Sequence, residues 1–208
     1  MEDSAVLNRR ERKMQETAAR ITSVSRRLTA ERGLSGFTVE EVCDEVDISR
    51  RTFFNYFPSK EDAVMGANQA EEATLFAEQF LARDSDGWPK VIDDLVDIVI
   101  EHFSGAGLDV AGHGEFMAAI EREPKLLVRF IGVTRDRERE AMALVAVREG
   151  VSADDPRAEA AINVLTTIIR SAGDQFFAPD NTSDVSSLML DSLAALRVVL
   201  APSPPRKA

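Results

Sequence analysis

Residues 38–60 of the chain read TVEEVCDEVDISRRTFFNYFPSK. This stretch holds two short segments of helical pattern, joined by Asp47-Ile48-Ser49, a turn of the length found in helix-turn-helix motifs. Thr38 followed three residues later by Glu41 has the form of a capping box, which marks the start of the first segment. The apolar residues of that segment recur at helical spacing: Val39, Val42 and Val46. The stretch therefore predicts a helix-turn-helix.

The second segment presents two different faces. Phe53 and Phe57 are four residues apart and are expected to face the core. At about 100° per residue, Arg51 and Asn55 lie on the other side of the helix from Phe53, and Arg50 projects from its start. Arginine binds guanine through two hydrogen bonds, and asparagine pairs in the same way with adenine. We therefore predict these three polar residues as base readers, with ordinary solvated side chains as the alternative.

Side chains that suit phosphate oxygens surround this segment. They are three hydroxyls and one ammonium: Thr38, Thr52, Tyr56 and Lys60. Contacts of this kind fix the register of a protein on DNA and carry no sequence information. The sequence therefore predicts phosphate contacts at these positions.

The rest of the chain is helical in pattern as well, and no hairpin turn separates stretches of alternating polarity. Glycine and proline divide the chain into about nine helices, near 8–32, 38–46, 49–57, 59–83, 89–103, 114–123, 124–149, 155–177 and 183–200. We therefore predict an all-α fold. Its parts are a three-helix DNA-binding head in residues 1–60, a ligand-binding and dimerisation domain in 61–200, and a disordered tail in 201–208.

Charge is distributed unevenly along the chain, whose net charge is −11. Residues 1–60 carry 11 Lys+Arg against 10 Asp+Glu, while residues 61–208 carry 14 against 26. The first part can therefore meet phosphates, and the second repels them. No apolar run is long enough to span a membrane, and the N-terminal residues lack the apolar region of a secretory signal. With Cys43 as the single cysteine, no intramolecular disulfide is expected, and we predict a cytoplasmic protein.

Residues 36–62, which end in ISRRTFFNYFPSKED, resemble the signature of the tetracycline-repressor (TetR) family, and the likeness covers residues 10–66. The resemblance implies that segment 50–55 enters the major groove and that the basic N-terminal arm approaches the minor groove. It also implies phosphate contacts from Thr38 and Lys60. The remaining two-thirds of the chain resembles the family in the number and length of its helices.

Two positions depart from the family pattern. Asp47 stands where a turn glycine is usual, and Phe54 stands where a tyrosine is frequent. Aspartate tolerates a positive φ better than most residues, so the turn is expected to survive. Phe54 lacks the hydroxyl of tyrosine and therefore forfeits one hydrogen bond to phosphate.

The resemblance also assigns the last two long helices to a dimer interface of four helices, two from each subunit. The sequence has an apolar stripe on each of them, from which we predict these interface residues: Leu165, Ile168, Ile169, Leu193 and Leu196. The same stripes equally describe a core within one subunit, and that alternative stays open at this point.

A ligand pocket is expected among the fifth to eighth helices. Polar side chains within apolar helices and nearby aromatic residues are its candidates: His102, Phe103, Phe116, Met117, Phe130, Asn163, Thr167 and Arg170. The opening EPKLL of residues 123–127 is similar to a branch of the family that binds acyl-CoA-like ligands. The negative charge of residues 61–208 suits a neutral or cationic hydrophobic compound at least as well. The two histidines lack metal-ligand spacing, so neither a metal site nor a cofactor is expected.

These observations favour a ligand-responsive transcriptional repressor, which binds a palindromic operator as a homodimer and is released by a small-molecule effector. An enzyme with an all-helical pocket is a second hypothesis, for which the chain offers neither a Gly-x-Ser-x-Gly elbow nor a His-x-x-x-His pair. The third is a ligand-blind adaptor that keeps a vestigial DNA-binding head.

Overall fold

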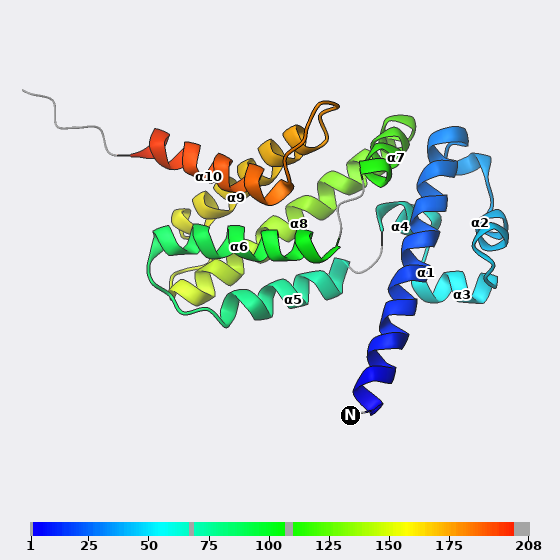
Figure 1. The fold of residues 1–208 in the computed structure, drawn as a ribbon, viewed down its shortest axis with the longest axis horizontal. Coiled ribbons are helices and arrows are strands. Elements are labelled where there is room, and N and C mark those ends of the chain that lie inside the picture. The colour runs from blue at the N-terminus through cyan, green and yellow to red at the C-terminus, as the bar shows by residue number, and fades with distance from the viewer. Residues whose placement is uncertain (1, 67–68, 107–109, 202–208) are drawn as a thin grey trace, which may run out of the picture. The chain divides into compact units, whose positions relative to one another are not determined.

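The computed structural model describes residues 2–66, 69–106 and 110–201, with side chains in 12–66, 73–103 and 112–201. This described part contains ten α-helices, a short 3-10 helix and no strand (Figure 1), which confirms the all-α prediction. The helices are α1 (Glu2–Arg32), α2 (Val39–Val46), α3 (Arg50–Tyr56), α4 (Lys60–Met65), α5 (Gln69–Leu81), α6 (Trp88–Ala106), α7 (Val110–Arg122), α8 (Pro124–Glu149), α9 (Pro156–Phe176) and α10 (Val185–Leu200). The 3-10 helix η1 (Leu34–Gly36) lies between α1 and α2. The predicted tail from 202 onward lies outside the described residues.

Where the sequence predicts one helix over residues 59–83, the structure has two, α4 and α5. Helix α4 ends at Gly66, whose φ of 106° lies in a region that residues with a Cβ rarely adopt. The Gly66 N–H donates to the carbonyl of Asp62 at 3.0 Å and closes the helix. A single glycine inside a helical pattern does not by itself predict the end of a helix, because helices also tolerate glycine at a modest cost in stability.

By internal contacts the chain divides into two compact units. The first unit comprises Met1–Ala73 and Asp109–Asp136, and the second comprises Thr74–Leu108 and Arg137–Ala208. Helix α7 and the first part of α8 therefore belong with α1 to α4, whereas the sequence places everything after residue 60 in one domain. The functional boundary at residue 60 stays a prediction.

Helix α1 is the centre of the first unit and packs against α2, α4 and α7. Buried apolar side chains from α1 to α4, α7 and the start of α8 form one core, which includes Ile21, Leu28, Val42, Val46, Phe53, Phe57, Val64, Ile120 and Leu126. Removing this apolar surface from water is the main term that stabilises the unit.

Arg26 joins three helices of the first unit. From α1 its guanidinium donates to the carbonyls of Val64 at 2.9 Å and Met65 at 3.4 Å, and to that of Gly112 in α7 at 3.5 Å. The last carbonyls of a helix have no partner within the helix, so these bonds satisfy the end of α4. The guanidinium also lies 4.7 Å from the centre of the Phe116 ring.

The second unit consists of α5, α6, α9, α10 and the later part of α8. Helix α9 packs against both α6 and α10, and α10 also packs against α6. Their apolar faces form a second core, which includes Phe80, Leu95, Ile98, Ile162, Leu165, Ile168, Met189 and Leu193.

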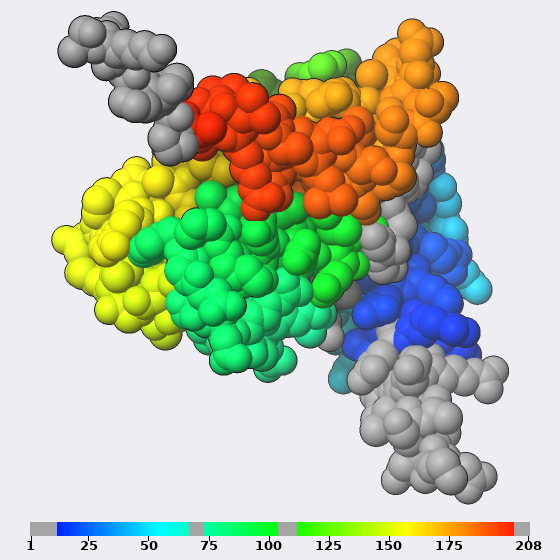
Figure 2. Space-filling view, turned by 60° about the vertical axis from the view of Figure 1, so that its left-hand side comes forward, coloured from blue at the N-terminus to red at the C-terminus, as the bar shows by residue number. Residues whose placement is uncertain are grey.

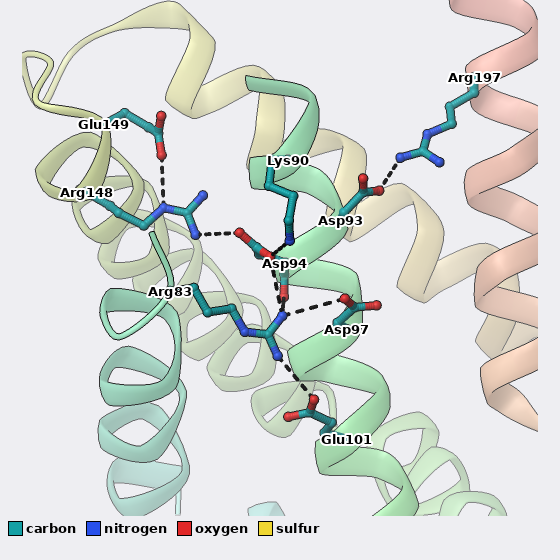
Figure 3. A network of polar contacts seen from close by, with 9 residues as sticks. All are labelled: Arg83, Lys90, Asp93, Asp94, Asp97, Glu101, Arg148, Glu149 and Arg197. Carbon is teal, nitrogen blue, oxygen red and sulfur yellow. Dashed lines mark hydrogen bonds and ion pairs between the residues drawn. The ribbon is translucent and has the colours of Figure 1, made fainter. Parts of the chain in front are cut away.

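A network of charged residues, of which Asp94 and Arg148 are buried, lies in the second unit (Figure 3). Asp94 of α6 has a side-chain exposure of 0% and accepts hydrogen bonds from Lys90, from Arg83 at 3.5 Å and from Arg148 at 2.9 Å. The Arg148 side chain is 4% exposed and its guanidinium lies 3.9 Å from the centre of the Phe80 ring. Burial alone would raise the pKa of Asp94, but Lys90 and Arg148 outweigh it and hold the pKa below its usual value.

Candidate nucleic-acid interface

The helix-turn-helix is built by local hydrogen bonds. The Thr38 hydroxyl accepts from the Glu41 N–H at 3.2 Å, and the Glu41 carboxylate accepts from the Thr38 N–H at 2.8 Å, so the predicted capping box is present. Ser49 caps α3 by accepting from the Thr52 N–H at 3.0 Å. Both helices of the motif therefore begin where their capping residues predict.

The turn between these helices depends on a left-handed residue, Asp47, with φ 59° and ψ 55°. This is the position at which the sequence lacks the usual turn glycine. Asp47 is exposed, so its backbone conformation matters more than its packing. The turn survives, as expected, because aspartate tolerates this region better than most residues.

We expect Asp47→Ala to lower the free energy of unfolding by about 1 kcal/mol, because alanine is strained at positive φ. Asp47→Gly should be at least as stable as the wild type at this position, because glycine adopts this conformation without a Cβ clash. Urea unfolding of the three proteins checks the order. Equal stability of the alanine and glycine variants would show that the turn is not strained.

Helix α3 presents the two faces that its sequence predicts. Phe53 and Phe57 are buried in the first core, while Arg51 and Asn55 are exposed on the other side. No described residue forms a hydrogen bond or ion pair with the side chain of Arg51 or Asn55. These two side chains are therefore available to base edges.

Arg50 differs from the other two predicted base readers because it already has partners. Its guanidinium forms an ion pair with the carboxylate of Glu40 in α2 and lies 5.5 Å from the centre of the Phe54 ring. No local sequence pattern indicates this contact, since Glu40 and Arg50 are ten residues apart and meet only when the turn brings α2 against α3.

The predicted phosphate-binding hydroxyls are placed in different ways. Thr38 is exposed at the start of α2, and the Thr52 hydroxyl shares a hydrogen bond of 2.8 Å with the Ser49 hydroxyl. Tyr56 is half-buried and its ring packs against the first core. Contact of these residues with phosphate stays a prediction.

Lys60 is placed in a way that the sequence did not indicate. Its ammonium donates to the carbonyl of Leu34 and to that of Phe37 at 2.7 Å, and it lies 4.5 Å from the centre of the Phe37 ring. Glu123 holds the same turn by accepting from the Leu34 N–H at 2.7 Å. In this structure Lys60 therefore ties α4 to the chain before α2, and the phosphate contact assigned to it stays a prediction.

Residues 21–64 match the family of bacterial regulatory proteins named tetR. The HTH-type transcriptional regulator TcmR of Streptomyces glaucescens is 30% identical to the chain over 154 residues, which are 70% of this chain and 66% of TcmR. The chain belongs to the TetR family. It is a regulator with a helix-turn-helix DNA-binding domain.

Two solved structures resemble this TetR-family chain at low identity. A transcriptional regulator from Aquifex aeolicus is 14% identical, with a TM-score of 0.49, over 88% of this chain and 99% of that one. GusR of Salmonella enterica is 22% identical, with a TM-score of 0.43, over 88% of this chain and 96% of its own.

The predicted pocket residues of this regulator do not form one group. Phe116, Met117 and Phe130 belong to the first unit, where the Phe116 and Phe130 rings lie 5.5 Å apart, and the other five belong to the second. His102 and Phe103 are half-buried in the second unit.

The three polar candidates of α9 are not interior residues of the second unit. Asn163, Thr167 and Arg170 are exposed along one side of α9, opposite its buried face. They therefore do not line the interior of that unit, and contact of these residues with a ligand stays a prediction. The sequence placed them inside because they interrupt an apolar helix, but they occupy the polar face of an amphipathic one.

The predicted interface residues lie mostly in the core of their own subunit. Leu165 and Leu193 are each 6% exposed and Ile168 is fully buried, all in the core of their own subunit. Ile169 and Leu196 are half-buried against that core. The apolar stripes thus pack mainly within one subunit, which is the alternative that the sequence leaves open. Helical periodicity identifies a buried face but does not indicate which segment covers it.

Helix α10 has a second apolar side that the sequence analysis passed over. Leu190, Ala194 and Val198 follow one another at four-residue spacing, and all are exposed, Val198 at 78%. Figure 2 shows α10, in orange to red, open along its length.

Two features are absent from the described part of the chain. None of its helices is long and apolar enough to cross a membrane. No group of three or more histidine, cysteine, aspartate or glutamate side chains there is arranged to hold a metal ion.

Proposed function

We propose that this chain is a ligand-responsive transcriptional repressor, which binds a palindromic operator as a homodimer and is released by a small-molecule effector. The observation that carries the proposal is the outer face of α3, where Arg51 and Asn55 stand exposed while Phe53 and Phe57 anchor the helix to the core. Side chains of these two types recognise guanine and adenine in the major groove. Acting on operator DNA, the protein works in the cytoplasm.

A homodimer supports this function because a single helix-turn-helix offers only a small recognition surface. Two heads held at a fixed spacing of about 34 Å, or a multiple of it, meet successive major grooves on one side of the DNA. Linking them raises affinity through effective concentration. The outer side of α10, with Leu190, Ala194 and Val198, is the apolar surface that we assign to the interface.

The effector is a small molecule with a hydrophobic part. Residues 61–208 carry 14 Lys+Arg against 26 Asp+Glu, a field that opposes a multiply charged anion. The Arg129 guanidinium, a group suited to such an anion, already forms an ion pair with Asp62 in the first unit. These observations favour a neutral or cationic compound over an acyl-CoA.

Selection of duplexes from a random DNA library by the purified full-length protein tests the proposal. We expect a palindromic site, with half-site centres about 10 base pairs apart or a multiple of that. Recovery of random sequences, or of a single half-site without symmetry, would contradict it.

Arg51→Ala should weaken binding to the selected site by about 1 to 3 kcal/mol and relax the preference at one base pair of each half-site. Arg51→Lys is the matched control, because lysine keeps the charge and lacks the planar fork that binds guanine at two points. It should retain affinity for random DNA and lose the base preference. A substitution scan of the operator that finds the same preference in all three proteins would remove Arg51 from the base readers.

A further inference from the structure

Glu40, Arg50 and Phe54 form a cluster on the exposed surface of the helix-turn-helix. Glu40 is the second residue of α2, Arg50 is the first residue of α3, and Phe54 follows one turn later on α3. The Glu40 carboxylate pairs with the Arg50 Nη1 group, and the same guanidinium lies 5.5 Å from the centre of the Phe54 ring. The side chains of Glu40 and Arg50 are 52% and 65% exposed, and Phe54 is 44% exposed.

Stability of the fold does not account for this cluster. An exposed ion pair contributes little to stability, because solvent screens it and two long side chains lose freedom. Helix α3 is already held by Phe53 and Phe57, which are buried in the first core. A carboxylate beside a recognition helix also opposes the approach of phosphates. A role in DNA recognition would explain why a carboxylate, a guanidinium and an aromatic ring lie together here.

We infer that Glu40 and Phe54 hold Arg50 in the orientation in which it reads a base, so that Glu40 is a specificity-determining residue of the operator complex. The inference rests on the proposed function, since it concerns how that DNA is read. A guanidinium has five N–H groups in a planar fork. Glu40 engages Nη1, which leaves the Nη2 and Nε hydrogens for base acceptors, while the Phe54 ring limits rotation of the fork.

Preorganisation has a measurable consequence. A free arginine must lose side-chain freedom when it binds a guanine, whereas a held arginine has lost it beforehand. Without Glu40 the guanidinium is free to turn to the nearest phosphate of any sequence, and affinity is gained where it carries no base information. The opposite role, in which Glu40 keeps Arg50 away from DNA, predicts the opposite change on removing the carboxylate.

The test uses Glu40→Ala in the full-length protein, with Glu45→Ala as the matched control. Glu45 also lies on α2, is exposed to a similar degree at 46%, and pairs with an arginine, Arg27 of α1, that is not on the recognition helix. Both variants remove one negative charge, so both should bind random duplex DNA more tightly at low salt. Thermal unfolding of each variant establishes that it is folded.

Binding is then measured on the operator selected by the wild type and on its single-base substitutions. Glu40→Ala should reduce discrimination at one base pair of each half-site by about two- to fivefold, the range that coupling of an exposed ion pair allows. Glu45→Ala should leave every preference unchanged. Arg50→Ala should abolish the same preference, and adding Glu40→Ala to it should change that preference no further.

Several results would overturn the inference. They are unchanged or sharper discrimination in Glu40→Ala, an equal loss of affinity on all sequences, and additive effects in the double variant. If the wild type selects an operator and Glu40→Ala reads it normally, the inference fails while the proposed function stands. If the wild type selects no sequence at all, both fail together.

Discussion

Asp94→Ala should lower the free energy of unfolding of the second unit by about 3 kcal/mol, because it removes the α6 carboxylate from the buried Arg148 guanidinium and leaves Glu149 as the remaining carboxylate paired with it. Lys90 and Arg83 also pair with Asp94, and they reach solvent more readily. The expected loss therefore comes chiefly from Arg148, whose side chain is 4% exposed.

Trp88 allows the loss of stability to be measured in the second unit. It is the single tryptophan of the chain, and its ring packs against the second core. Urea unfolding followed by tryptophan fluorescence therefore reports the second unit. Asp97→Ala is the control, since Asp97 pairs with Arg83 at 3.6 Å but is 52% exposed, and a change within about 0.5 kcal/mol is expected there. Equal effects of the two substitutions would show that Arg148 needs no partner in α6.

The difference in stability between the wild type and Asp94→Ala should depend on pH. Because the pKa of Asp94 is lowered in the folded protein, its contribution to stability is present above the unfolded value of about 3.9 and is lost as the pH falls through the folded value. The wild type should therefore lose its advantage over Asp94→Ala on acidification below about pH 4. A constant difference between the two proteins from pH 7 down to pH 3 would contradict this assignment.

A second large effect is expected from charge on the outer side of α10. Leu190→Glu combined with Val198→Glu should convert the homodimer into folded monomers, because the two carboxylates would be buried without partners in an apolar interface. Affinity for the operator should fall at least about a hundredfold, since the gain from linking two heads is lost. Sedimentation and footprinting on the selected operator measure both results.

Leu165→Glu is a control that distinguishes an effect on the core from an effect on the interface. Leu165 is 6% exposed within the subunit, so a carboxylate there should destabilise the second unit by several kcal/mol whether or not a dimer forms. The α10 double variant should instead unfold as a monomer without this loss in the core. If that double variant remains a dimer with wild-type affinity, the interface lies on another surface.

The sequence alone determined the helix-turn-helix and the face of α3 that is exposed. Capping at Thr38 and Ser49 depends on residues at most three positions away, and the turn at Asp47 depends on one residue's φ. The alternation between Phe53 inside and Arg51 outside follows from the helical period. Local interactions of this kind involve residues only a few positions apart, so they can be predicted from the sequence.

What each buried face packs against, and which polar groups become partners, depends on the packing of the folded chain. Leu165 and Leu193 belong to an apolar pattern that serves a core and an interface equally well, and packing of α9 on α10 assigned them to the core. Arg50 and Lys60 are suited to DNA by chemistry, yet their partners here are Glu40 and two backbone carbonyls, which folding brings close. Periodicity specifies that a side chain is inside or outside, whereas its neighbour depends on segments distant in sequence, and local patterns carry no information about those.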